Sequence, residues 1–198
     1  GTEQLRQANR YRHRNDEDME EWMKQLEHCT LCPRACGVNR ITGNTGACHT
    51  DAQMRVARAA LHFWEEPCIS GQEGSGAIFF TGCALGCVFC QNTDISRGQA
   101  GKTVTVEQLA RICLNLQAQG ANNINLVTAG HYLPAVAEAL KLAKAQGLQI
   151  PVVYNSSGYE KPEALRLLDG LVDIYLPDMK YMDADLARKY SHAGDYPE

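Results

Sequence analysis

The 198-residue sequence has no apolar run approaching the roughly 18 residues that indicate a membrane-spanning helix. It also has little net charge: 19 Lys and Arg against 23 Asp and Glu give a formal charge of −4, which argues against nucleic-acid binding through a basic face. Its polar beginning, GTEQLRQANRYRHRNDEDMEE, lacks the apolar centre of a secretory signal. We therefore expect a cytoplasmic protein that binds neither membranes nor nucleic acids.

Cysteine is the abundant residue, with nine copies. An odd number excludes complete intramolecular disulfide pairing. Seven of the cysteines fall in two tight groups: Cys29, Cys32, Cys36 and Cys48, and then Cys83, Cys87 and Cys90. Without an export signal, such clusters indicate metal or redox sites rather than disulfides. Cys113 lies on the apolar stripe of a predicted helix and is expected in the core.

From residue 77 onward, buried-looking strands alternate with amphipathic helices. Strands are predicted at 77–80, 124–127, 150–154 and 171–176, and helices at about 105–119, 133–146, 162–168 and 183–190. Thr105 and Gln108 form a T-x-x-Q capping box at the first of these helices. The alternation predicts an α/β fold with a parallel βα repeat. Before this region, a short helix is expected over 16–27, and residues 54–63 fit either a strand or a helix.

Each predicted strand ends in a polar cluster. In parallel α/β folds, ligands bind at the carboxyl ends of the strands, so the four clusters are expected to line one site. They are Thr81–Cys83, Thr128–His131, Asn155–Ser157 and Pro177–Lys180.

The segment FFTGCALGCVFCQN carries three thiols with the spacing C-x3-C-x2-C. Thiolates suit zinc or iron–sulfur clusters, and three of them would leave one iron of a four-iron cluster without a protein ligand. A zinc site would need a fourth ligand, such as His131 or Cys68. The same positions would also form a buried stripe if the segment were helical.

The earlier group, Cys29, Cys32, Cys36 and Cys48, has the spacing C-x2-C-x3-C-x11-C. Four thiols in this pattern suit tetrahedral zinc or an auxiliary iron–sulfur cluster, and the spacing does not choose between them. The alternative is a loop of reduced thiols without a metal.

The three-cysteine motif, with CTLCPRACGVNR, EEPCISGQEGSG, NINLVTAGHYLP, VVYNSSGYE and VDIYLPDMKY, resembles the radical S-adenosylmethionine (SAM) superfamily, in the subgroup related to pyruvate formate-lyase activating enzymes. The resemblance covers residues 28–198. It implies a partial TIM-type barrel of about four βα units. It also implies three parts: a tail and short helix over 1–27, a Cys-rich N-terminal module over 28–76, and a core over 77–198 that is truncated at its C-terminus.

The resemblance further implies that Cys83, Cys87 and Cys90 hold a [4Fe–4S] cluster whose fourth iron binds SAM. Reductive cleavage of SAM would give a 5′-deoxyadenosyl radical that abstracts hydrogen. An electron donor such as flavodoxin or ferredoxin would be a partner, and the substrate could be a protein. The residues implied to bind SAM are Phe89, Asn92, Asn155, Ser156, Asp178 and Lys180.

One position departs from the activating-enzyme pattern. Those enzymes carry Gly-Gly-Glu after the second strand to bind the SAM amine, whereas this sequence has Ala129-Gly130-His131. A neutral His131 can accept a hydrogen bond but cannot supply a carboxylate, so recognition of the amine by Gly130 and His131 is open. The competing interpretation is a non-catalytic module, either an electron carrier with a Cys-bound iron–sulfur cluster or a zinc protein.

Overall fold

The computed structural model describes residues 21–198. The predictions for residues 1–20, which are the tail and the start of the 16–27 helix, lie outside the described residues. Residues 21–25 are helical and continue into the 3₁₀ helix η1 (Leu26–His28).

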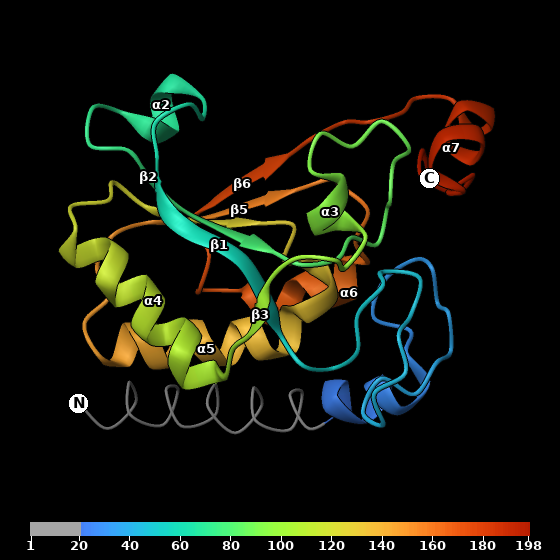
Figure 1. Cartoon of the computed structure of the whole chain (residues 1–198), viewed down its shortest axis with the longest axis horizontal. Helices are drawn as coiled ribbons and strands as arrows, with labels where there is room; N and C mark the ends of the chain where they lie inside the picture. The colour runs from blue at the N-terminus through green and yellow to red at the C-terminus, as the bar shows by residue number, and fades with distance from the viewer. Residues whose placement is uncertain (1–20) are drawn as a thin grey trace, which may run out of the picture.

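The centre of the fold is a six-stranded sheet with the order β3-β1-β2-β4-β5-β6 (Figure 1). The four strands β2, β4, β5 and β6 are parallel, which confirms the predicted α/β class and the βα repeat. The strands are β1 (Arg55–His62), β2 (Ser75–Phe80), β3 (Lys102–Thr103), β4 (Ile124–Val127), β5 (Val152–Ser156) and β6 (Ile174–Pro177).

Residues 54–63, which fit either a strand or a helix by sequence, form β1. This strand lies in the predicted 28–76 module yet pairs antiparallel with β2, and β3 adds a second antiparallel pair on its outer side. The sheet therefore starts before residue 77. The sequence pattern did not indicate these pairings, because antiparallel partners are chosen by the path of the chain rather than by local periodicity.

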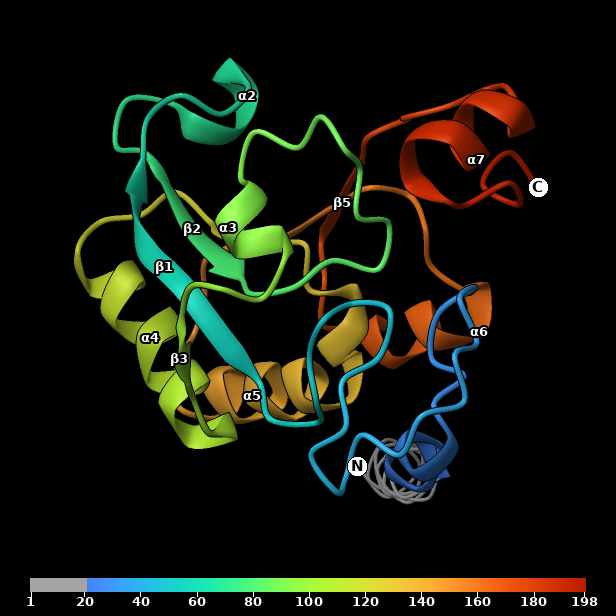
Figure 2. The ribbon, with the colours of Figure 1, turned by 45° about the vertical axis from the view of Figure 1, so that its right-hand side comes forward.

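Helices α4 (Val106–Ala118) and α5 (Leu133–Ala145) cover one face of the sheet (Figures 1 and 2). At the start of α4, the Thr105 hydroxyl accepts the Gln108 amide at 3.2 Å and the Gln108 side chain accepts the Thr105 amide at 2.8 Å. This confirms the predicted capping box. Cys113 is fully buried in the core between these helices and the sheet, as expected.

The remaining helices are short or peripheral. They are α2 (Pro67–Ser70), α3 (Thr93–Ser96), η2 (Gly130–Tyr132), α6 (Pro162–Leu165) with η3 (Arg166–Leu168), and α7 (Ala184–Ser191). Figure 2 shows α3 on the side of the sheet opposite α4 and α5. The carboxyl ends of the parallel strands thus lead towards the loop after β2 and towards α7 (Figure 1). No helix among residues 21–198 has both the length and the apolar character needed to cross a membrane.

Candidate functional site

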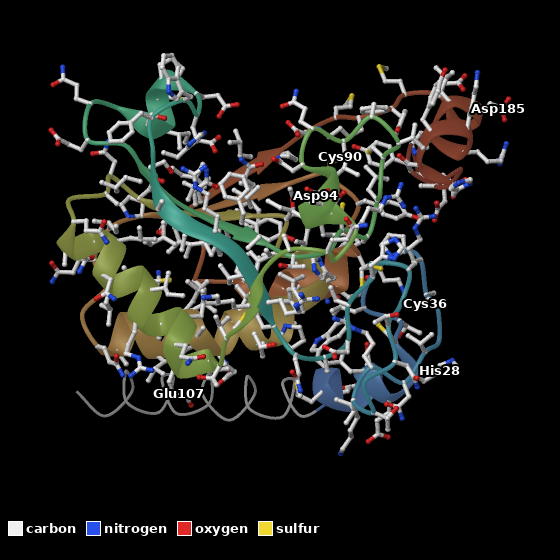
Figure 3. The ribbon with its side chains drawn as sticks, in the orientation of Figure 1. His28, Cys36, Cys90, Asp94, Glu107 and Asp185 are labelled. Carbon is white, nitrogen blue, oxygen red and sulfur yellow. The ribbon has the colours of Figure 1, made fainter. Side chains whose placement is uncertain are left out.

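The three clustered thiols lie on an irregular loop, Cys83–Cys90, that directly follows β2 (Figure 3). No part of this loop is helical, so the buried helical stripe is the wrong interpretation of their spacing. The chain enters the loop through Gly82 at φ +90°, where a Cβ would lie 2.5 Å from the Cys48 carbonyl oxygen. Glycine is therefore required to bring Cys83 close to the N-terminal module.

The loop presents backbone amides to its first thiol. The Gly86 amide donates to Cys83 Sγ at 3.5 Å. Burial raises the pKa of Cys83, and the amides of Gly86 and Leu85 act in the opposite direction. Amide donors of this kind stabilise a thiolate, the form that binds metals. Across residues 21–198, no three Cys, His, Asp or Glu side chains are already arranged around a common metal position.

Phe89, within the three-cysteine motif, and Asn92, just after it, both lie near the surface. Phe89 is 57% exposed and packs edge-to-face with Tyr181 and Tyr190, at ring-centre distances of 6.2 and 6.4 Å. Asn92 is exposed at the start of α3 and its side chain does not cap the helix. Phe89 is therefore a ring presented beside the thiols rather than a core residue.

The end of β6 brings a charged pair to the loop. Lys180 Nζ lies 2.6 Å from Asp178 Oδ2. Partial burial lowers the pKa of Lys180, but Asp178 outweighs this, and the neighbouring Cys87 thiol adds to the rise. The predicted Lys180 therefore lies within electrostatic range of Cys87, although the two residues are far apart in sequence.

His131 occupies a different environment from the one predicted. Its ring is 2% exposed, and Nε2 lies 2.7 Å from the Thr81 carbonyl oxygen. Burial lowers its pKa to about 3, with the nearby Arg40 guanidinium contributing in the same direction. The neutral ring donates Nε2–H to Thr81 and thereby supports the end of β2. Cys68, the other zinc ligand considered, lies on α2 before β2 begins, at the opposite end of that strand.

A carboxylate that the sequence analysis missed lies beside Gly130. Tyr154 OH and Ser156 Oγ donate to the two oxygens of Glu160 at 3.2 and 3.1 Å. A Cβ on Gly130 would lie 2.9 Å from Glu160 Oε1, so the carboxylate fills the space that a side chain there would need. Burial raises the pKa of Glu160, and the hydrogen bonds from Ser156 and Tyr154 oppose the rise.

Only the tertiary structure brings Glu160 to this place. The residue follows β5 by four positions, whereas Gly130 follows β4, and the two strands are parallel neighbours. The signal available in the sequence was an acidic residue in the polar cluster after Asn155 and Ser156. Asn155 itself is half-buried at the end of β5, with its carbonyl accepting the Thr128 amide at 2.9 Å.

The earlier four cysteines lie in one compact segment, residues 29–48, at the right of Figure 3, where Cys36 is labelled. Cys29 and Cys48 are buried, Cys32 is half-buried and Cys36 is exposed. Two hydrogen bonds of 3.0 Å close a turn around the first three: Cys29 N to the Val38 carbonyl, and Gly37 N to the Cys29 carbonyl. The segment contacts the Cys83–Cys90 loop directly, since Cys83 N donates to the Cys48 carbonyl at 3.2 Å.

The fold is a parallel βα sheet, and three thiols lie on the loop after its first parallel strand. These two features place the protein in the class of α/β cores that bind a cofactor at the carboxyl ends of their strands. Residues 77–198 match the model of the Radical SAM superfamily, and the chain belongs to this family. No solved structure matches the chain.

Two relatives are similar to parts of this chain. The chain is 33% identical over 178 residues to an uncharacterized protein of Methanocaldococcus jannaschii, covering 86% of this chain and 51% of the relative. It is 30% identical over 113 residues to the pyruvate formate-lyase-activating enzyme of Clostridium pasteurianum, covering 54% of this chain and 46% of the relative. The chain is thus related to the activating enzymes, and it spans about half the length of both relatives.

Proposed function

We propose that this chain forms the cluster- and SAM-binding part of an enzyme that reductively cleaves SAM at a [4Fe–4S] cluster. The observation that carries the proposal is the Cys83–Cys90 loop, which holds three thiols and thiol-directed amides at the end of β2 in a chain of the radical SAM family. Three thiolates without a fourth fit a cluster with one iron open to a small molecule.

When bound, the cluster supplies the electron that breaks a C–S bond of SAM and yields methionine and a 5′-deoxyadenosyl radical. The protein's own contribution is to bind and orient SAM and to exclude water. Lys180, which lies within electrostatic range of Cys87, would attract the SAM carboxylate. The exposed ring of Phe89 offers an apolar surface for the adenine.

Glu160 is our candidate for the anion that faces the SAM ammonium group. Its carboxylate lies against Gly130, in the segment Ala129–His131 that aligns with the Gly-Gly-Glu of activating enzymes. The hydroxyls of Tyr154 and Ser156 hold the carboxylate in one orientation while leaving each oxygen a further acceptor position. Glu160 would therefore supply the carboxylate that His131 cannot.

The hydrogen donor for the radical would be a protein, and the electron would come from a flavodoxin or ferredoxin. The first statement is supported by the relationship to an enzyme named for activating pyruvate formate-lyase. The exposed apolar side chains Val88 and Phe89 on the cluster loop and Met179 and Met182 beyond β6 give a partner protein a surface to contact.

Electron paramagnetic resonance tests the cluster and its open iron. The protein is reconstituted anaerobically with iron and sulfide, reduced, and measured with and without SAM. We expect a [4Fe–4S]⁺ signal that changes on addition of SAM and is lost in Cys83→Ala but kept in Cys68→Ala, a control at an exposed cysteine away from the loop. A signal indifferent to SAM would favour the electron-carrier alternative, and the absence of any cluster would favour a zinc protein.

The Glu160 assignment is tested by SAM affinity. A charge-assisted hydrogen bond contributes about 1.5–3 kcal/mol, so Glu160→Gln should weaken SAM binding by roughly 10- to 100-fold. The cluster signal without SAM should not change. Glu163→Gln, at an exposed position on α6, is the matched control. Equal affinities in the two variants would remove Glu160 from the site.

A further inference from the structure

The four thiols of residues 29–48 are not used by the proposed reaction, and the structure brings them together. A Cβ on Gly46 would lie 2.9 Å from Cys36 Sγ and 3.8 Å from Cys48 Sγ, so both sulfurs face the same glycine. Tight turns fold the chain between the first three cysteines: Ala35 N donates to the Cys32 carbonyl and Gly37 N to the Cys29 carbonyl, each at 3.0 Å.

A buried cation next to the thiols is a second, independent observation. Arg40 is 2% exposed and forms no ion pair with a carboxylate among residues 21–198. Its donors reach the carbonyls of Asp51 at 2.6 and 3.1 Å and of His131 at 2.8 Å, and Nη1 lies 3.9 Å from Cys29 Sγ. A buried guanidinium without a counter-charge is costly, whereas four thiolates on a divalent ion carry a net charge of −2.

We propose that Cys29, Cys32, Cys36 and Cys48 bind one Zn²⁺ ion in a closed tetrahedral site that holds the Cys83–Cys90 loop in position. Zn–S bonds of about 2.3 Å place the sulfurs of such a site about 3.8 Å apart, and four thiolates complete the tetrahedral coordination of a structural zinc. Metal binding would draw the side chains onto one ion from their present rotamers.

The second half of the proposal follows from two connections between the segment and the loop. Cys48, a ligand, accepts the Cys83 amide through its carbonyl. Arg34, between the ligands Cys32 and Cys36, donates to the carbonyls of Ala84 and Leu85 at 2.9 Å each, and also to Ser191 and His192 at the end of α7. A metal that fixes Cys32, Cys36 and Cys48 therefore also fixes both contacts with the loop. This role does not depend on the proposed SAM reaction.

Metal analysis tests the site. Protein purified in air with a chelator wash, which removes a labile iron–sulfur cluster, should retain about one zinc per chain and no comparable iron. Cys36→Ser, at the exposed ligand, should lose the zinc, while Cys83→Ala and Cys68→Ser should keep it. Wild-type protein without zinc, or with about four irons that disappear in Cys36→Ser, would overturn the zinc assignment. Loss of zinc in Cys83→Ala but not in Cys36→Ser would place the metal in the other group.

Hydrogen exchange tests the connection to the loop. Zinc is removed with a strong chelator in the absence of denaturant. Hydrogen exchange of the Cys83 amide should then speed up at least tenfold, because this amide donates its hydrogen bond to the Cys48 carbonyl. The amides of α4, which bond within their own helix rather than to the segment, are the internal control and should be unchanged. Unchanged Cys83 exchange with zinc fully removed would refute the bracing role while leaving the metal site intact. Faster exchange in α4 as well would indicate general unfolding and would also count against it.

Discussion

The buried His131 predicts that this protein loses stability as the pH falls. The neutral ring donates to the Thr81 carbonyl, is closed off from solvent, and lies close to the Arg40 guanidinium. Burial and the Arg40 guanidinium disfavour the imidazolium form, and together they outweigh the Thr81 carbonyl, which favours it. The folded-state pKa is therefore lowered to about 3, from the value of 6.5 expected in the unfolded chain.

The sign and size follow from proton linkage. Between pH 6.5 and 3, the unfolded chain binds a proton at this position and the folded chain does not, so the unfolded state gains stability as pH falls through this window. At pH 5 the difference amounts to about 2 kcal/mol, and each further pH unit adds about 1.4 kcal/mol until the folded-state pKa is reached. Above pH 6.5 this residue causes no pH dependence.

Urea unfolding of wild type and His131→Gln at pH 7.5 and pH 5 measures the effect. Gln can still donate to the Thr81 carbonyl but does not titrate. Other groups titrate in both proteins and cancel, so the wild type should lose about 2 kcal/mol more than the variant between the two pH values. Equal losses, or an NMR titration of the His131 ring with a midpoint near 6.5, would refute the reasoning and would indicate a ring that faces solvent or ligand.

Three further substitutions test contacts around the site. Arg34→Lys keeps the charge but cannot span several carbonyls at once, so thermal unfolding should show a loss of about 2 kcal/mol, against almost none for the exposed Arg111→Lys. Gly82→Ala meets the Cys48 carbonyl at 2.5 Å and should abolish cluster loading, whereas Gly147→Ala, also at positive φ but in open space, should cost about 1 kcal/mol and load normally. Thr105→Ala removes the cap of α4; chemical denaturation should give a loss of about 1 kcal/mol, and no change would mean the cap is dispensable.

Several features of this protein could be predicted from the sequence because they depend on neighbours within a few residues. The α4 capping box needs only Thr105 and Gln108, and the apolar stripe that buries Cys113 needs only helical periodicity. The four parallel strands and the helices that follow β4, β5 and β6 show in similar local patterns, as does α4, whereas the short β3 and α3 were not predicted. The thiol spacing of the Cys83–Cys90 loop also identified the family before any contact was known.

The partners of the site residues depended on the tertiary structure. Local pattern cannot tell that β1 pairs antiparallel with β2, or that the β4 and β5 ends bring Glu160 against Gly130. His131 appeared at a strand end in the sequence, but the packing of the N-terminal segment and Arg40 over it made it a buried support for Thr81. The reason is physical: periodicity determines which face of an element is apolar, whereas the contacts among distant loops are determined only when the whole chain packs and each buried polar group must find a partner.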